Sequence, residues 1–384
     1  MNKDSWEIKM IGEVFDLYMG RTPSRSNPMY WGDNTGYKWV SISDIGNEKY
    51  IQTTKEFISE LGKKESKIKV VPKGTVIMSF KLSIGKVAIT TEDMYTNEAI
   101  MAFHPINSNI FEKNYIYYYL KGYDWIGSNR AVMGTTLNKF SISNSKIVIP
   151  PLPIQEQIVK ELDTLSDIIT KKKEQLAELD KLAQATFYDM FGDPVKNERN
   201  WSTKILNEIA PAIASKDNIT PINNKYWLLN LDMIESDTGY ITNYKYVSLS
   251  EIGNSTYKFD TTNLLYSKLR PYLNKVVNPT MSGYATTELV PLKPDIKYLN
   301  KVFLSSLLRS KSFVNYIKDK VTGTKMPRTD MNTFKNFSLI VPPLSLQSQF
   351  VKKVENIEQQ KELINQSITD VQLLFDYTMD KYFN

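Results

Sequence analysis

An internal repeat limits this chain to a fold with two similar halves. The run PPLPIQEQIV at Pro150–Val159 returns as PPLSLQSQFV at Pro342–Val351, 192 residues later. Further matches recur at an offset of 189, pairing Tyr37–Ile42 with Tyr226–Leu231 and Gly134–Leu137 with Gly323–Met326. Several matches in one order, separated by small insertions, indicate a duplication, and a duplication must be explained before any other feature.

Each half is predicted to be a mixed α/β domain. The 384 residues exceed one typical domain. Short β-type runs bounded by Gly, Pro and Asn occur in both halves, at 38–42, 75–79, 86–90 and 147–149, and again at 227–231, 263–266, 288–292 and 338–341. Helical stretches are expected at 114–122 and 300–318. The predicted division is 1–150 and 193–341 for the two domains, with long helices at 151–192 and 342–384.

Both long helices carry a heptad pattern. Apolar residues follow each Pro-Pro at 4-3 spacing, which predicts a coiled-coil seam. The seam residues are Ile158, Leu162, Leu165, Ile169, Leu176, Leu179, Phe350, Val354, Ile357, Ile364, Ile368 and Val371. Because a domain lies between the helices, antiparallel pairing would give a pseudo-twofold molecule with two α/β domains separated by the coiled coil. Lys172 and Lys361 would place a charge in the seam, at a cost in stability and a gain in register. The alternative is that each helix packs on its own domain.

The positive charge of the chain is concentrated in the globular parts. The formal net charge is +6, but 155–192 carries 5 basic and 8 acidic side chains and 347–384 carries 4 and 6. The rest of the chain therefore carries +11. Such a distribution suits a polyanionic ligand on the domains, although ordinary solvated surface gives the same excess.

Sequence patterns typical of an active site are missing. The chain has no cysteine and one histidine, His104, which excludes Cys-ligated zinc and a His-pair metal site, and no metal site is predicted. No phosphate loop or dinucleotide-binding element occurs. Asn27–Tyr30 (NPMY) resembles the Asn-Pro-Pro-Tyr motif of amino-group DNA methyltransferases, but a turn explains it better. No run is apolar enough to span a membrane and no signal peptide pattern is present, so we expect a cytoplasmic protein.

Polar, basic loops punctuated by glycine recur at corresponding places in the two halves. Arg can contact guanine at two points in the major groove, whereas Lys, Ser and Thr favour phosphates. The predicted DNA-contacting residues are Arg21, Thr22, Ser24, Arg25, Lys81, Ser83, Lys86, Thr135, Thr136, Asn138 and Lys139 in the first half, and Lys268, Arg270, Lys275, Thr324, Lys325 and Arg328 in the second. Asn97-Glu98 and Thr287-Glu288 are predicted only to end strands.

These features together resemble the specificity subunit of type I restriction-modification enzymes. The resemblance rests on the Gly-x-Thr-Pro-Ser loop at Gly20–Ser24, the Gly-Thr-Thr-Leu loop at Gly134, and both Pro-Pro-Leu-x-Ile/Leu-Gln-x-Gln entries to long helices. It covers essentially the whole chain. One departure is that the second half has Pro211–Ser215 (PAIAS) where the first has Gly-x-Thr-Pro-Ser, so contacts of Arg21 or Arg25 are not carried over.

The resemblance implies a non-catalytic subunit with two target-recognition domains, each reading one half of a bipartite site in double-stranded DNA. The helices would act as a spacer and dock two methyltransferase subunits, which bind S-adenosylmethionine; this chain itself would hold no cofactor. Whether two motor-nuclease (restriction) subunits also join stays open. Two other readings are a coiled-coil interaction scaffold that binds no DNA, and a degenerate methyltransferase acting through Asn27–Tyr30.

Overall fold

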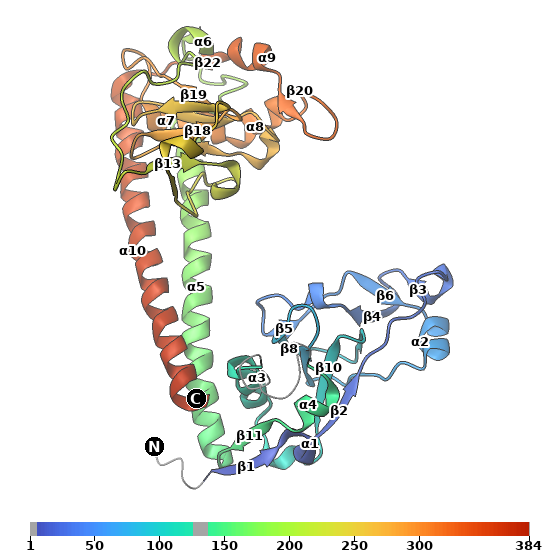
Figure 1. Ribbon diagram of the computed structural model, residues 1–384. Helices are drawn as coiled ribbons and strands as arrows, with labels where there is room; N and C mark the ends of the chain where they lie inside the picture. The colour runs from blue at the N-terminus through green and yellow to red at the C-terminus, as the bar shows by residue number, and fades with distance from the viewer. Residues whose placement is uncertain (1–5, 126–136, 384) are drawn as a thin grey trace. The chain divides into compact units, whose positions relative to one another are not determined.

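The computed structural model describes residues 6–125 and 137–383, which fold into two compact units. The first unit is Met1–Lys171 with Ser367–Asn384, and the second unit is Lys172–Gln366. Two helices, α5 (Leu152–Phe191) and α10 (Leu344–Phe383), contribute residues to both units. Each unit is therefore completed by one end of α5 and one end of α10 (Figure 1).

The described residues of the first unit form three sheets and four short helices. The five-stranded sheet has the order β2 (Phe15–Met19), β10 (Ile100–Pro105), β7 (Val76–Ser79), β8 (Val87–Thr90), β5 (Tyr50–Ile51). The four-stranded sheet has the order β3 (Trp31–Gly32), β6 (Glu56–Ile58), β4 (Tyr37–Val40), β9 (Tyr95–Thr96), and β1 (Glu7–Met10) pairs with β11 (Lys146–Ile149). The helices are α1 (Ile11–Val14), α2 (Glu60–Ser66), α3 (Lys113–Gly122) and α4 (Lys139–Ser143), with 3-10 turns η1 (Pro28–Tyr30), η2 (Ile42–Asp44) and η3 (Ser108–Ile110).

The second unit contains four sheets. They are β14 (Lys245–Val247), β13 (Tyr226–Leu229), β18 (Gly283–Thr286), β15 (Thr256–Phe259); β17 (Val276–Val277), β16 (Leu264–Ser267), β19 (Leu289–Leu292); β12 (Thr203–Ile205) with β22 (Ser338–Ile340); and β20 (Val321–Thr322) with β21 (Arg328–Thr329). The helices are α6 (Leu206–Ile209), α7 (Lys301–Arg309), α8 (Lys311–Ile317) and α9 (Met331–Lys335), with 3-10 turns η4 (Leu231–Met233), η5 (Leu249–Glu251) and η6 (Pro271–Leu273).

Equivalent strands of the two units pair in the same register, as the sequence repeat predicts. In the first unit β4 runs parallel to β9 with Trp39 opposite Tyr95, and in the second β13 runs parallel to β18 with Leu228 opposite Tyr284. Both partners of the second pair lie 189 residues after those of the first. The antiparallel pair β7–β8 likewise corresponds to β16–β17, and β7–β10 corresponds to β16–β19. The duplication inferred from short motifs is therefore a duplication of strand pairing.

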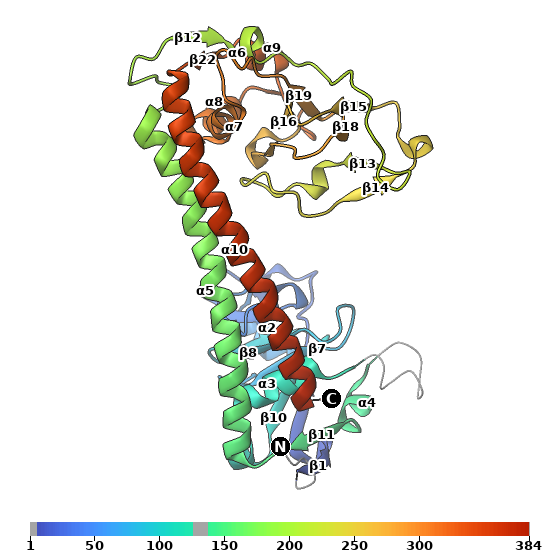
Figure 2. The same cartoon turned by 90° about the vertical axis from the view of Figure 1, so that its left-hand side faces the viewer.

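The long helices pack against each other in antiparallel fashion inside each unit (Figures 1 and 2). In the first unit the Tyr382 hydroxyl near the end of α10 donates to Glu161 near the start of α5, at 2.7 Å. In the second unit Phe350 near the start of α10 packs on Phe191 at the end of α5, with 5.4 Å between ring centroids. All predicted seam residues are buried or half-buried. This placement agrees with mutual coverage of the two apolar stripes.

A buried glutamine fixes the start of each long helix. The Gln155 amide nitrogen donates to the carbonyls of Ile110 and Pro150 at 2.9 and 2.8 Å, and its oxygen accepts from the Glu112 amide at 2.9 Å. Gln347 repeats the arrangement, donating to Tyr298 and Pro342 and accepting from Asn300. Both glutamines are fully buried. Because Glu112 and Asn300 are the N-caps of α3 and α7, each glutamine connects a long helix to the short helix beside it.

The predicted mixed α/β fold with two long helices is confirmed, with one difference in a helix. The single helix expected at 300–318 is two helices, α7 and α8, separated at Ser310. Ser310 has an extended backbone (φ −61°, ψ 142°), and its side chain accepts from the Phe313 amide at 3.2 Å. Serine competes with the helical backbone in this way, so it ends one helix and caps the next. No helix within the described ranges is long and apolar enough to cross a membrane.

Candidate nucleic-acid interface

In the second unit, backbone hydrogen bonds bring together two of the loops predicted to contact DNA. The turn after β16 donates from Arg270 to the Pro327 carbonyl at 2.7 Å, and Thr329 donates to the Lys268 carbonyl at 2.7 Å. These bonds attach the β20–β21 hairpin to the turn, so Lys268, Arg270, Lys325 and Arg328 belong to one local surface. Arg270 and Lys325 are exposed, as is Thr324 in the same hairpin.

A glutamate holds Arg328 in place. The Arg328 Nε lies 3.0 Å from Glu288 Oε1, and Nη2 lies 2.8 Å from the same oxygen. This hydrogen bonding raises the pKa of the Arg328 guanidinium above its usual value. A fork-shaped guanidinium fixed by one carboxylate keeps its remaining donors directed, which suits recognition of a base edge or a phosphate.

In the first unit, the Gly20–Asn27 loop is held by two further glutamates. Thr22 donates its hydroxyl to Glu98, and Arg25 forms a two-pronged pair with Glu56, with Nη2 at 2.9 Å from Oε2. The Arg25 guanidinium also lies over the Trp31 ring, 3.8 Å from its centroid. The hydrogen bond from Arg25 lowers the pKa of the Glu56 carboxyl. The loop is therefore a preformed surface rather than a pair of free arginines.

Backbone packing explains why this loop begins with glycine. A Cβ on Gly20 would lie 1.8 Å from the Thr96 carbonyl oxygen of β9, which no side chain can do. The next residue, Arg21, donates its amide to the same carbonyl at 2.9 Å, and its guanidinium donates to the Ser66 carbonyl. Ser24 shares a hydrogen bond with Ser26 at 2.8 Å. Pro211–Ser215, which lacks this glycine, instead lies against β19 and β15 through the amides of Ile213 and Ser215.

The turn between β7 and β8 presents three of the predicted contacts to solvent. Lys81, Ser83 and Lys86 are all exposed. The turn is closed by Ser79, whose hydroxyl donates to the Ser83 carbonyl and accepts from the Lys86 amide. Lys139 is exposed at the start of α4. Thr135 and Thr136 lie outside the described residues.

Two of the side chains predicted to contact DNA form hydrogen bonds within the fold. The Lys275 ammonium donates to the Leu231 carbonyl at 2.7 Å, and its burial lowers the pKa of this group. The Asn138 side chain caps α4 by accepting from the Ser141 amide at 2.9 Å. The Lys275 and Asn138 side chains are therefore engaged within the fold, as those of Arg25 and Arg328 are, and their DNA contacts stay predictions. The sequence could not reveal these hydrogen bonds, because lysine and asparagine are also common in exposed loops where they bond to nothing in the protein.

The sequence prediction missed the glutamates that hold side chains of the candidate interface. Glu98 and Glu288 were expected only to end strands, yet they pair with Thr22 and Arg328. Glu98 follows β9 and Glu288 follows β18, and these strands occupy equivalent places in the two parallel pairs. The two glutamates lie 190 residues apart, so the repeat itself could have marked them as equivalent residues. Asn27, by contrast, forms the expected turn: its side chain accepts from the Met29 amide at 3.1 Å at the start of η1.

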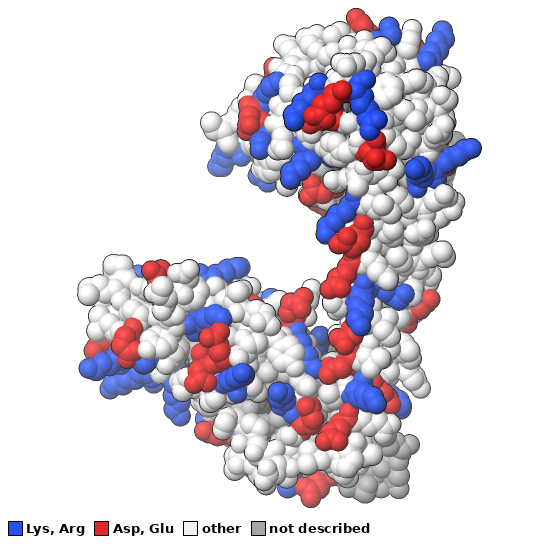
Figure 3. Space-filling view, turned by 180° about the vertical axis from the view of Figure 1, so that it is seen from behind, with Lys and Arg blue, Asp and Glu red and all other residues white. Residues whose placement is uncertain are grey.

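The helix pair carries charged groups of both signs. On the face shown in Figure 3, Lys and Arg alternate with Asp and Glu along the long helices. In the second unit Lys361, which is 3% exposed, lies 2.5 Å from Asp180 and 3.1 Å from Glu358 and faces the Tyr240 ring at 4.4 Å. The seam charge that the sequence predicted at Lys361 is therefore neutralised by acidic groups on both helices.

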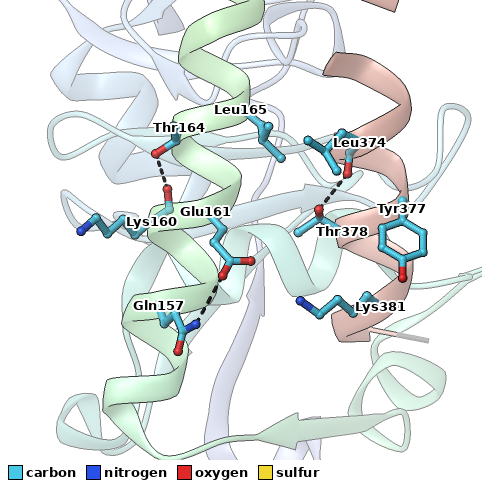
Figure 4. Close-up of a pocket in the computed structure, with 9 residues that line it drawn as sticks. All are labelled: Gln157, Lys160, Glu161, Thr164, Leu165, Leu374, Tyr377, Thr378 and Lys381. Carbon is cyan, nitrogen blue, oxygen red and sulfur yellow. Dashed lines mark hydrogen bonds between the residues drawn. The ribbon is translucent and has the colours of Figure 1, made fainter. Parts of the chain in front are cut away.

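A cavity of about 530 Å³ opens between α5 and α10 in the first unit (Figure 4). Leu165 and Leu374 point toward one another across it, and Tyr377 and Lys381 line its outer side. Leu374 and Tyr377 are more than half exposed. An exposed apolar strip on a paired helix is a common site for another helix to dock.

Known proteins share this arrangement. Residues 3–181 match the family described as the type I restriction modification DNA specificity domain. The type I restriction enzyme MjaIX specificity subunit of Methanocaldococcus jannaschii is 26% identical over an alignment that covers 91% of this chain and 86% of that one. Residues 3–181 are therefore similar to the specificity domain of type I restriction-modification systems, and nearly the whole chain is similar to a specificity subunit.

Solved structures of this family share the fold. The type I restriction-modification S subunit of M. genitalium superposes with a TM-score of 0.55 at 12% identity, covering 100% of this chain and 98% of that one. A chain from a study of assembly and conformational transition of the type I R-M system gives a TM-score of 0.57 at 18% identity, covering 99% and 98%. At these identities the likeness concerns the fold alone. Among the described residues, no group of three or more acidic or histidine side chains is arranged to hold a metal.

Proposed function

We propose that this chain is the DNA-reading subunit of a type I restriction-modification complex. Residues 1–150 and 193–341 would be two target-recognition domains, each reading one half of a bipartite site in double-stranded DNA. Residues 151–192 and 342–384 would link them and dock the catalytic partners. Similarity to the specificity subunits supports this function, and so does the absence of typical catalytic motifs from the sequence.

The observation that carries the proposal is the cationic surface at the β16 turn and the β20–β21 hairpin. Lys268, Arg270, Lys325 and Arg328 come from segments up to 60 residues apart and are fastened together by backbone hydrogen bonds. Lysines neutralise phosphates and arginines can grip a guanine edge. The first unit offers the equivalent turn with Lys81 and Lys86, and it also has the Gly20–Asn27 loop with Arg25 paired to Glu56.

The proposed function also implies which partners this chain binds. Two methyltransferase subunits would dock on the helix pair and bring S-adenosylmethionine, so this chain would bind no cofactor itself. The exposed Leu374 and Tyr377 beside the interhelical cavity support a helical docking partner. Two motor-nuclease subunits would join in a complex that also restricts DNA.

The decisive experiment compares genome methylation before and after deletion of this gene. Single-molecule sequencing should show that one split motif, methylated on both strands, disappears and returns when the wild-type gene is restored. An unchanged methylome would refute the proposal. Exchange of residues 195–341 for the corresponding segment of another family member should alter one half of the motif only, and alteration of both halves would refute the modular assignment.

The alternative of a coiled-coil scaffold makes a contrasting prediction. A scaffold would show no salt-sensitive duplex binding, even when the methyltransferase partner is present. The proposed function expects the affinity of the assembled complex to fall steeply with salt, because each phosphate contact releases a counterion. A filter-binding or anisotropy titration at several salt concentrations separates the two.

A further inference from the structure

The turn after β7 and the turn after β16 have the same backbone design. Ser79 ends β7 and donates its amide to the Lys86 carbonyl at 2.9 Å, and Ser267 ends β16 and donates to the Lys275 carbonyl at 3.0 Å. The residue after each serine is also bound alike, Phe80 to the Ala99 carbonyl and Lys268 to the Glu288 carbonyl, both at 3.0 Å. The two turns are therefore equivalent positions of the duplicated unit.

The third residue after each serine adopts a left-handed backbone conformation. Leu82 has φ +62° and Arg270 has φ +50°. Most other non-glycine residues with positive φ in the described ranges are Asn or Asp, which tolerate this conformation, and Leu82 is the only apolar one. A residue that disfavours its own backbone conformation persists where something other than folding selects it.

The Leu82 side chain does nothing for the stability of the fold. It is 95% exposed, more than any other large apolar side chain among the described residues. Neighbouring Lys81, Ser83 and Lys86 are exposed as well, so the leucine projects from a polar, cationic turn. Ser79 is fully buried, and its side chain and backbone both anchor the turn from which Leu82 projects.

We infer that Leu82 and Arg270 occupy one base-reading position that the two units share, with different target bases. This rests on the proposed function and specifies how each half-site is read. In the major groove a leucine side chain matches the C5 methyl group of thymine, whereas an arginine matches the O6 and N7 acceptors of guanine. Leu82 therefore selects a thymine in the first half-site, and Arg270 selects a guanine in the second.

Charged neighbours supply the affinity that such a contact needs. Lys81 and Lys86 flank Leu82, while Lys325 lies in the hairpin fastened beside Arg270. Phosphate contacts from these lysines would fix the register of the turn on the duplex without reading sequence, and the left-handed residue between them would read it. This division predicts that the lysines and the left-handed residues respond differently to substitution.

The test uses the complete complex with its methyltransferase partner and reads out the methylated motif by sequencing. Leu82→Ala should relax one position of the first half-site, losing roughly 5-fold to 100-fold discrimination there. Leu82→Arg should shift that same position toward guanine. Arg270→Leu should shift one position of the second half-site toward thymine. None of these three variants should alter the half-site read by the other unit.

Matched variants separate base reading from general binding. Lys81→Ala should weaken binding to all duplexes and reduce the salt slope by about one, whereas Leu82→Ala should leave the slope unchanged. Ile106→Ala removes another exposed apolar side chain of the first unit, 65% exposed, and should change neither the half-site nor the salt slope. Leu82→Asn keeps a residue suited to the left-handed turn, and its melting temperature should equal or exceed that of the wild type.

Each outcome decides a different claim. If the Leu82 and Arg270 variants keep the wild-type motif, or change both half-sites together, this inference is refuted while the proposed function stands. If the Leu82 variants bind the methyltransferase partner more weakly and the methylation that remains keeps the wild-type motif, the side chain is a protein contact and the inference is again refuted. If the wild-type complex methylates no split motif, the proposed function itself fails.

Discussion

Removing one acidic partner of the buried seam lysine gives a sharp test of how the helix pair is held. Asp180→Asn takes the charge from the group 2.5 Å from Lys361 and keeps its size. The ammonium stays 3% exposed and retains only Glu358 on its own helix, at 3.1 Å. A buried charge that loses a partner is costly, because water cannot replace what was removed.

The expected cost lies between those of buried and surface pairs. Loss of one partner of a fully buried pair costs about 3–5 kcal/mol, and a surface pair is worth about 0–1 kcal/mol. Asp180 and Glu358 side chains are 35% and 42% exposed, so water screens part of the interaction. We expect Asp180→Asn to lower the free energy of unfolding by about 2 kcal/mol, roughly 30-fold in the unfolding equilibrium. With a urea slope of about 2 kcal/mol/M, the midpoint falls by about 1 M.

The matching substitution of the lysine has the opposite expectation. Lys361→Met removes the buried ammonium and places an apolar side chain in an apolar seam, next to Ile357 and Ile364. Because both carboxylates reach solvent, this variant should unfold at the same urea concentration as the wild type or higher. In the Lys361→Met background, Asp180→Asn should cost nothing further.

Urea unfolding of the purified chain, followed by circular dichroism, measures these midpoints. Glu178→Gln is the control, since it breaks an ion pair with Lys181 whose side chains are 70% and 73% exposed, and should shift the midpoint little. The reasoning is wrong if Asp180→Asn matches the wild type, or if Lys361→Met loses as much stability as Asp180→Asn does.

Three further predictions concern other parts of the chain. Glu288→Gln removes the charge that holds Arg328, so the complex should bind duplex DNA more tightly at low salt, with a log–log salt slope steeper by about one; an unchanged slope in a salt titration would contradict this. Burial raises the pKa of the Glu112 carboxyl. The charged form therefore costs stability above that pKa, and Glu112→Gln should melt higher than the wild type at pH 7, with the difference closing as the pH is lowered through the raised pKa; a constant difference between pH 7 and pH 4 would show another cause. Phe191→Ala opens a hole among Phe187, Phe303 and Phe350, whose ring centroids lie 5.2, 4.8 and 5.4 Å away, and should cost about 3–5 kcal/mol in the urea assay, whereas a loss below 1 kcal/mol would mean that the site collapses freely.

The sequence was sufficient for features that depend on periodicity and local chemistry. The heptad pattern predicted one buried apolar stripe on each long helix, and the Pro-Pro segments predicted where each helix begins. The strand runs were placed within about two residues because glycine, proline and asparagine bound them. Gln155 and Gln347 were visible as repeated letters, but their role needs the carbonyls of Ile110 and Tyr298, 45 and 49 residues away.

Long-range pairing is what the sequence could not supply. Glu56 and Glu288 pair with arginines 31 and 40 residues distant, and the residues next to them in sequence do not identify these partners. Lys275 resembles Lys86 in the repeat, yet its ammonium is bound by the Leu231 carbonyl of η4, while Lys86 is exposed. A loop lysine's role depends on what the rest of the fold places next to it.

The two equivalent turns share their backbone hydrogen bonds and differ in the exposed side chains that are proposed to read bases. Serines 79 and 267 make the same backbone hydrogen bonds, and the parallel strand pairs keep the same register. The side chains that differ, Leu82 and Arg270, are exposed and contribute little to either core. A substitution at these positions therefore changes what the turn presents without disturbing what holds it. Because the folding constraint acts on the buried serines and the selective constraint on the exposed third residue, one half can acquire a new target while the other keeps its own.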